Sequence, residues 1–398
     1  MTATTETETS RAVLTDDARY MRRALQLARR GLGETRPNPP VGAVLVKGTA
    51  TDAVIIGEAR TAVGGRPHAE RIAITNACDA GFDPAGATLY VTLEPCAHTG
   101  RTPPCVEAII GHRIARVVVG VLDPDPRVNG AGVRALRAQR VVVDAASGQD
   151  AQASAFVSAG HLLRMTQQRP FVQVKLAMSG DDRIATGTGT APVWLTGKAA
   201  RADVHLLRAQ ADAILVGSGT VRADNPRLDC RLPGLAGASP DRVVMDRALS
   251  VSPFAAVFAN RGAAKAATLL FSEAEPAPSQ ASGFEAQSVQ IMRPADGVTP
   301  ASVLAALAER GITRVMIEGG PTIAQAFLDA DLVDEMVLYR APVMLGEQGV
   351  PALAPRTLQA LGDEGAWEGQ APLMLGDDTR KRFLRRRALW TTPAVVQP

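Results

Sequence analysis

The sequence predicts an α/β protein built from two domains. Short apolar, β-branched segments alternate with helical patterns along most of the chain, which is typical of an α/β architecture. This alternation occurs in two series, separated by an Ala/Gln/Ser-rich stretch around residues 145–168, and 398 residues are many for one domain. We expect a disordered tail (1–14), a first domain (15–146), a connecting segment (147–168) and a second domain (169–398).

The first series begins with a helix that Thr15 or Asp16 can cap and that Gly31 and Gly33 can end. The strands expected after it cover residues 41–46, 53–56, 88–92 and 117–121, with helices opening at His68 and at Cys105. A helix N-terminus favours negative charge, so ligands placed there are easier to deprotonate.

The second series contains expected strands at residues 171–177, 213–217, 242–246, 267–271, 314–318 and 334–339. No glycine-rich Rossmann fingerprint follows any of them. Residues 273–288 are rich in Pro, Ser, Ala and Glu, and we interpret them as a surface insertion.

Composition narrows the class of protein. Hydrophobic residues make up 46% and charged residues 21%, and the net charge of +3 is too balanced to favour nucleic acid or an acidic membrane surface. The polar opening residues and the lack of a long apolar stretch lead us to expect a cytoplasmic protein. Reduced cysteines in that compartment are metal ligands or core residues more often than disulfide partners.

The stretch from His68 to Cys105 carries the strongest chemical signal. It contains His68-Ala-Glu70, then Pro95-Cys96, then Pro104-Cys105. One imidazole and two thiols can supply three ligands to a tetrahedral zinc and leave the fourth position for water. Glu70 would then stand beside the metal and move protons, which is the arrangement that a zinc deaminase needs.

A structural zinc site, or three buried residues without a metal, is the plainer alternative. A structural site would need a fourth protein ligand, which His98 or Cys78 could supply. His98 is equally well placed for a substrate contact, and we expect Cys78 to be a core residue of its helix.

The residues of this region resemble a known family. Pro37-Asn-Pro-Pro-Val-Gly42, Pro67-His-Ala-Glu70 and the run from Thr92 to Cys105 are similar to the deaminase half of the bifunctional riboflavin-biosynthesis deaminase/reductase. The eight residues between Cys96 and Cys105 are typical of that branch, since cytidine deaminases usually separate these cysteines by two.

The resemblance implies a cytidine-deaminase-like α/β/α sandwich for the first domain. It implies zinc ligation by His68, Cys96 and Cys105, a proton-transfer role for Glu70, and substrate contacts by Asn38, His98 and Arg101. Asn38 also suits an ordinary Asn-Pro turn.

The second half resembles the reductase half of the same family through Trp194-Leu-Thr-Gly197, the run from Val216 to Pro226, and Glu318-Gly-Gly-Pro-Thr322. The resemblance implies a dihydrofolate-reductase-like α/β domain that binds NADPH. The implied cofactor-binding residues are Ala177, Trp194, Thr220, Asp224, Gly320, Pro321, Thr322, Ile323, Ala324, Gln325 and Ala326. Those implied to bind the ribose-phosphate substrate are Arg208, Leu228, Arg231 and Glu318, and Lys175 could lie near the reacting sugar carbon.

The implied reaction sequence has two steps. The first is hydrolytic deamination of 2,5-diamino-6-(5-phosphoribosylamino)pyrimidin-4(3H)-one, and the second is NADPH reduction of the ribosyl group to 5-amino-6-(5-phosphoribitylamino)uracil. The resemblance also implies a homodimer.

The second half departs from the family pattern at Asp182, Pro192 and Arg247, which fall on expected substrate contacts and on one edge of the cofactor site. One rival hypothesis is therefore a deaminase whose reductase-like domain is catalytically silent. A more distant one is a zinc-stabilised nucleic-acid-binding module, which the near-neutral charge disfavours.

Overall fold

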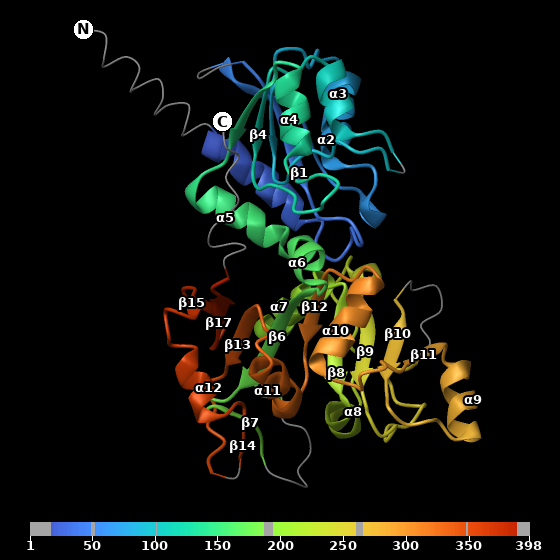
Figure 1. Ribbon diagram of the computed structural model, residues 1–398. Helices are drawn as coiled ribbons and strands as arrows, with labels where there is room; N and C mark the ends of the chain where they lie inside the picture. The colour runs from blue at the N-terminus through green and yellow to red at the C-terminus, as the bar shows by residue number, and fades with distance from the viewer. Residues whose placement is uncertain are drawn as a thin grey trace. The chain divides into compact units, whose positions relative to one another are not determined.

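The computed structural model describes residues 17–48, 52–100, 102–186, 194–259, 266–347 and 349–387. Contacts divide the chain into two units, of which the first extends to Gln168 and the second runs from Arg169 to Arg386. Each unit has its own sheet and its own core (Figure 1). No helix in the described ranges is long and apolar enough to cross a membrane. The expected tail and the capping residues Thr15 and Asp16 lie outside these ranges.

The first unit contains a five-stranded sheet in the order β2-β1-β3-β4-β5, in which β1 is antiparallel to β2 and β3, and the last three strands are parallel. Its strands are β1 (Gly42–Lys47), β2 (Val54–Arg60), β3 (Thr88–Val91), β4 (Arg116–Val119) and β5 (Val142–Ala145). Residues 17–29 form the first described helix, followed by the 3-10 turn η2 (Val63–Gly65), α2 (Ala69–Asp79), α3 (Cys105–Gly111), α4 (Ala131–Ala138), α5 (Gly148–Val157) and α6 (Ala159–Gln167).

Helices cover both faces of this sheet. The helix over 17–29 packs Met21 and Leu25 in one cluster with Val44 of β1. A Cβ built on Gly42 would come 1.9 Å from the Ala24 carbonyl oxygen, so the helix and strand backbones approach where only glycine fits. On the opposite face, α2 packs on β1 and β2, and α3 and α4 follow beside it (Figure 1). The result is an α/β/α sandwich.

The helices α5 and α6 occupy the stretch that we expected to connect the domains. Both belong to the first unit, and Val157 of α5 lies in the same core cluster as the helix over 17–29.

The second unit contains a ten-stranded sheet in the order β11-β10-β9-β8-β12-β6-β13-β17-β15, with β16 paired to β17. The strands from β11 to β13 in this order are parallel, and β17 is antiparallel to β13. The strands of this sheet are β6 (Phe171–Met178), β8 (Ala213–Gly217), β9 (Asp241–Met245), β10 (Thr268–Phe271), β11 (Val289–Met292), β12 (Arg314–Ile317), β13 (Glu335–Arg340), β15 (Trp367–Gly369), β16 (Leu373–Leu375) and β17 (Asp378–Arg385). A separate pair joins β7 (Arg183–Thr186) to β14 (Gly349–Pro351).

Helices also cover both faces of the second sheet. They are α7 (Lys198–Ala209), α8 (Ser218–Asp224), α9 (Pro278–Ala286), α10 (Pro300–Glu309), α11 (Pro321–Asp329) and α12 (Pro355–Ala360), with a short 3-10 turn η3 (Ala236–Ala238). Leu304 of α10 and Phe327 of α11 join the cluster around Val174 of β6. On the other face, Val204 of α7 packs against Met316 of β12.

The expectation that residues 273–288 form a surface insertion is right about the surface, since most of these residues are exposed or half-exposed, but wrong about the insertion, since they form the helix between β10 and β11. This segment contains α9, whose Phe284 is only 1% exposed and meets Phe258 edge to face with ring centroids 5.3 Å apart. The polar composition of the segment belongs to its outer face, while one aromatic residue anchors it in the core.

Candidate functional site

Three potential metal ligands converge in the first unit from three different elements. His68 is the residue before α2, Cys96 lies in the loop after β3, and Cys105 is the first residue of α3. One ligand atom from each lies within 4.8 Å of the others, and no other residue of the described chain joins this group.

The donor set fits zinc. Bonds of about 2.3 Å to sulfur and about 2.0 Å to nitrogen at tetrahedral angles would hold a sulfur and a nitrogen ligand about 3.5 Å apart. The His68 Nδ1 atom lies 3.6 Å from the Cys96 sulfur and 3.4 Å from the Cys105 sulfur. Two thiols and an imidazole are also ligands that zinc prefers.

The surroundings favour a thiolate at Cys96. Hydrogen bonding from the Cys105 thiol and from His68 lowers the pKa of Cys96 well below its ordinary value, against the effect of burial. The Cys105 backbone N–H, at the start of α3, also donates to the Cys96 sulfur over 3.4 Å. A thiolate is the form that binds a metal.

Glu70 lies in the first turn of α2, with its side chain buried. Burial raises the pKa of Glu70, and the nearby His68 charge opposes this shift only in part. A carboxyl whose pKa is raised toward neutrality can accept and return a proton during a reaction.

The other residues expected at this site differ in where the structure places them. The Asn38 side-chain amide donates to the Gly65 carbonyl over 2.7 Å, which ties its turn to the segment before His68. The Nδ1 atom of His98 is buried and has no hydrogen-bond partner among the described residues, but His98 does not join the ligand group. Arg101 lies outside the described residues.

The expectation that Cys78 is a core residue of its helix is wrong, because Cys78 is exposed and its neighbour Ala77 occupies the core position.

Sequence reasoning missed Glu94, two residues before Cys96. Glu94 is 3% exposed, and its carboxylate accepts backbone N–H bonds from Asp123 (3.3 Å), Gly130 (3.0 Å) and Val133 (3.2 Å). These bonds fix the loop carrying Cys96 against the start of α4. An acid within an apolar run needs such partners, and that signal could have found it.

In the second unit, several of the expected site residues lie where the sheet order reverses. The strand β12 lies between β6 and β8, although it follows both in sequence. Lys175 and Ala177 lie in the carboxyl half of β6, Gly217 ends β8, and Glu318 follows β12. Open parallel sheets bind ligands at such a switch point.

A buried ion-pair network occupies this point. Arg208 donates from Nε to Glu318 Oε2 and from Nη2 to Oε1, each over 2.8 Å, while its Nη1 donates to the Asp229 carbonyl over 2.9 Å. Lys175 Nζ lies 3.5 Å from the same Oε1. Burial alone would raise the pKa of Glu318, but the charges of Arg208 and Lys175 outweigh it and lower that pKa to about 2.

Some of the residues expected to bind the cofactor are joined by a hydrogen bond, and others lie apart from them. The Gly320 backbone N–H donates to Thr220 Oγ1 over 3.1 Å, which joins the start of α11 to α8. Burial raises the pKa of Asp224, and the charge of Lys175 opposes this shift. Trp194 is 77% exposed, with the Arg201 guanidinium 5.5 Å from its ring centroid.

Two residues expected to contact a ligand have side chains that are packed into the core and cannot reach it. Leu228 is 2% exposed and packs with Val216 and Val221, and Ala324 is fully buried. A ligand would meet these residues through their backbone. By contrast, Arg231 is half exposed and donates from Nη1 to Asp229.

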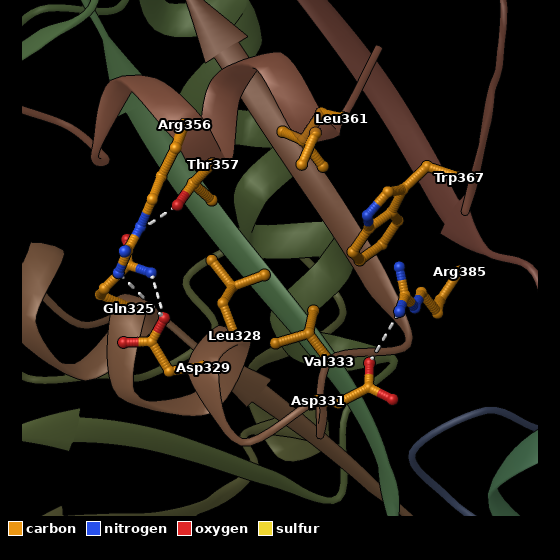
Figure 2. A pocket seen from close by; sticks show the side chains of 11 residues that line it. Gln325, Leu328, Asp329, Asp331, Val333, Arg356, Thr357, Leu361, Trp367 and Arg385 are labelled. Carbon is orange, nitrogen blue, oxygen red and sulfur yellow. Dashed lines mark hydrogen bonds and ion pairs between the residues drawn. The ribbon is translucent and has the colours of Figure 1, made fainter. Parts of the chain in front are cut away.

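Gln325 faces a separate cavity of about 290 Å³ near the carboxyl end of α11 (Figure 2). Its side chain donates to Asp329 and accepts from Thr357. Trp367 and Leu361 supply apolar lining, and Arg385 pairs with Asp331 at its rim (Figure 2).

Two of the three residues that depart from the family pattern, Asp182 and Arg247, lie within the described residues, and their conformation and contacts can be stated. Asp182 has a φ of 62° and pairs with Arg340, so an acid here occupies a left-handed position that suits glycine. Arg247 is exposed, and its carbonyl accepts the Glu273 N–H. Pro192 lies outside the described residues.

The fold and the first site define a zinc deaminase domain joined to a second α/β domain. Residues 14–121 match the model of the cytidine and deoxycytidylate deaminase zinc-binding region, and residues 170–368 match the RibD C-terminal domain. The riboflavin biosynthesis protein RibD of Haemophilus influenzae is 36% identical over 92% of this chain and 97% of its own. That of Escherichia coli is 37% identical over 87% and 93%, respectively.

Solved structures also match this chain over nearly its whole length. A Thermotoga maritima diaminohydroxyphosphoribosylaminopyrimidine deaminase/5-amino-6-(5-phosphoribosylamino)uracil reductase matches with a TM-score of 0.78 at 33% identity, over 94% of this chain and 99% of that one. RibD of Acinetobacter baumannii matches with a TM-score of 0.78 at 34% identity, over 94% and 100%.

The chain belongs to the RibD family of riboflavin biosynthesis proteins. It is a bifunctional deaminase and reductase that acts on small molecules, with zinc and NADPH as cofactors. The family resemblance and the fold class expected from the sequence are confirmed.

The network around Glu318 predicts a pH-dependent stability. The folded-state pKa of about 2 lies below the ordinary value of 4.5, so Glu318 stabilises the second unit above pH 4.5 and loses this effect as the pH falls toward 2. This lowering of the Glu318 pKa corresponds to about 3 kcal/mol of the free energy of unfolding at neutral pH. We expect Glu318→Gln to lower the free energy of unfolding of the second unit by about 3–5 kcal/mol at pH 7, because two cations remain buried.

Urea unfolding followed by tryptophan fluorescence measures this loss, since Trp194 and Trp367 both lie in the second unit. The gap between the wild type and Glu318→Gln should narrow below pH 4.5. A gap that is constant from pH 7 to pH 3 would contradict the ion-pair account.

Proposed function

We propose that the protein deaminates 2,5-diamino-6-(5-phosphoribosylamino)pyrimidin-4(3H)-one at C2 and then reduces the ribosyl group of the product with NADPH. The observation that carries the first step is the group of His68, Cys96 and Cys105 with the buried carboxyl of Glu70 beside it. The reductase family match over residues 170–368 and the polar network at the switch point support the second.

In the deaminase step, His68, Cys96 and Cys105 would hold zinc. Zinc supplies a Lewis acid that makes a water molecule nucleophilic near neutral pH. Glu70 accepts a proton from the attacking water and delivers it to the departing amine, a role that its raised pKa suits. Asn38 helps to hold the pyrimidine, and His98 and Arg101 contact the polar end of the substrate.

In the reductase step, the nicotinamide supplies the hydride and the protein orients both reactants. The backbone N–H groups at the start of α11, together with Thr220 and Asp224, bind the cofactor, with Ala177 and Trp194 at its edges. Arg208 holds Glu318 toward the substrate with its fork of donors, while Arg231 keeps donors available for the substrate phosphate. Lys175 lies nearest to the reacting sugar carbon.

We further propose a homodimer and a cytoplasmic location. A homodimer follows from the resemblance to the family. A reducing compartment suits the four cysteines, all of which are free thiols.

Replacing Glu70 by glutamine tests the proton-transfer role. Glu70→Gln keeps the size of the side chain and removes its ability to carry the proton, so we expect ammonia release to fall about 100- to 10,000-fold with zinc content unchanged. Glu107→Gln, an exposed acid in the first turn of α3, is the matched control and should keep the wild-type rate. Ammonia release at the wild-type rate by Glu70→Gln would refute the assigned role.

A coupled assay separates the bifunctional enzyme from a deaminase with a silent second domain. Supplied with the diamino substrate, the wild type should accumulate the deaminated intermediate without NADPH, and should form the ribityl product with equimolar NADPH oxidation when NADPH is present. Glu70→Gln should oxidise NADPH with the deaminated intermediate but not with the diamino substrate. Binding of NADPH without turnover of the intermediate would favour the silent-domain rival.

A further inference from the structure

Arg66 reaches the loop that connects the two cysteines of the zinc site. It lies two residues before His68, and its Nη1 donates to Thr102 Oγ1 over 3.0 Å. A Cβ built on Gly100 would lie 3.5 Å from Arg66 Nη2. The guanidinium therefore lies along the outer part of this loop.

A second arginine provides a contrast. Arg71, in α2, donates to the Pro104 carbonyl over 3.5 Å and thus contacts the backbone at the inner end of the same loop. Thr102 is half-buried and Gly100 is exposed, so Arg66 contacts the part of the loop that faces solvent. Arg71 braces the loop near its ligand Cys105, whereas Arg66 lies at its open edge.

The charge of Arg66 has no carboxylate counter-ion among the residues that the structure describes. Across the described ranges, no carboxylate forms an ion pair with it, and its one hydrogen bond uses a single nitrogen of the guanidinium. An unpaired arginine with open donors beside a reaction site is suited to an anion.

The substrate of the proposed deamination carries such an anion. Its pyrimidine must reach Glu70 and the ligand group, and its ribose links the pyrimidine to a phosphate at the other end. A phosphate that extends from the site along this loop would come near Arg66, which precedes His68 by two residues and contacts Thr102. The planar donor fork of an arginine matches phosphate oxygens better than an ammonium does.

We propose that Arg66 is a specificity-determining residue of the deaminase, which Thr102 holds in place to bind the substrate phosphate. This inference rests on the proposed deamination. Under this proposal the loop between Cys96 and Cys105 has a second role besides supplying ligands. Its residue Thr102 holds Arg66 in position toward the substrate.

Rates with and without the phosphate test this assignment. Ammonia release is measured with the phosphorylated diamino substrate and with its dephosphorylated form, for the wild type, Arg66→Ala, Arg66→Lys and the control Arg71→Ala. We expect Arg66→Ala to lower kcat/KM for the phosphorylated substrate about 10- to 100-fold, mainly through KM, and to leave the dephosphorylated substrate unchanged. Arg66→Lys should recover part of the loss, and Arg71→Ala should affect both substrates equally.

Two further readouts separate binding from folding. Inorganic phosphate should inhibit the wild type competitively and inhibit Arg66→Ala more weakly. Zinc content, and reduction of the deaminated intermediate by the second domain of the same chain, should be unchanged in Arg66→Ala.

An equal loss on both substrates, a loss of zinc, or unchanged discrimination between the substrates would overturn the assignment. Failure of the wild type to release ammonia from either substrate would instead refute the proposed deamination itself.

Discussion

The first unit depends on bringing two thiols and an imidazole within 4.8 Å of one another. This arrangement concentrates three metal-binding groups in a half-buried place, and a bound cation is what makes it favourable. Three features of the fold produce it: β3 ends in the loop that carries Cys96, His68 directly precedes α2, and α3 begins at Cys105. Glu94 then fixes the Cys96 loop through three backbone N–H groups, so the geometry is set by buried hydrogen bonds rather than by the loop alone.

The two domains use a buried carboxyl in opposite ways. Glu70 has no lysine or arginine partner among the described residues, and burial raises its pKa, which suits a group that must carry a proton. Glu318 is also largely buried, but Arg208 and Lys175 lower its pKa to about 2, which keeps it charged and fixes it in place. The surroundings of each acid therefore favour proton transfer at Glu70 and a fixed charge at Glu318.

Much of the fold and of the zinc site could be predicted from the sequence, because both rest on local patterns. The apolar strands and the short spacing from His68 to Cys105 are visible in the chain itself. What was missed depends on tertiary contacts. Cys78 and Ala77 share a helix, and only the position of β2 decides that Ala77 is the buried one. The core role of Phe284 is likewise hidden by its polar neighbours, and the contacts of Glu94 come from a distant loop. The occupation of the Arg208 fork by Glu318 and Asp229 is equally non-local.

The most direct test of the account is the metal content and coordination of the purified protein, measured by elemental analysis and by X-ray absorption at the zinc edge. We expect about one zinc per chain with two sulfur ligands, one imidazole nitrogen and one light, exchangeable ligand. Deaminase activity in a protein without zinc would contradict it. So would a zinc shell completed by a second imidazole, because His98 would then close the position that the reaction needs.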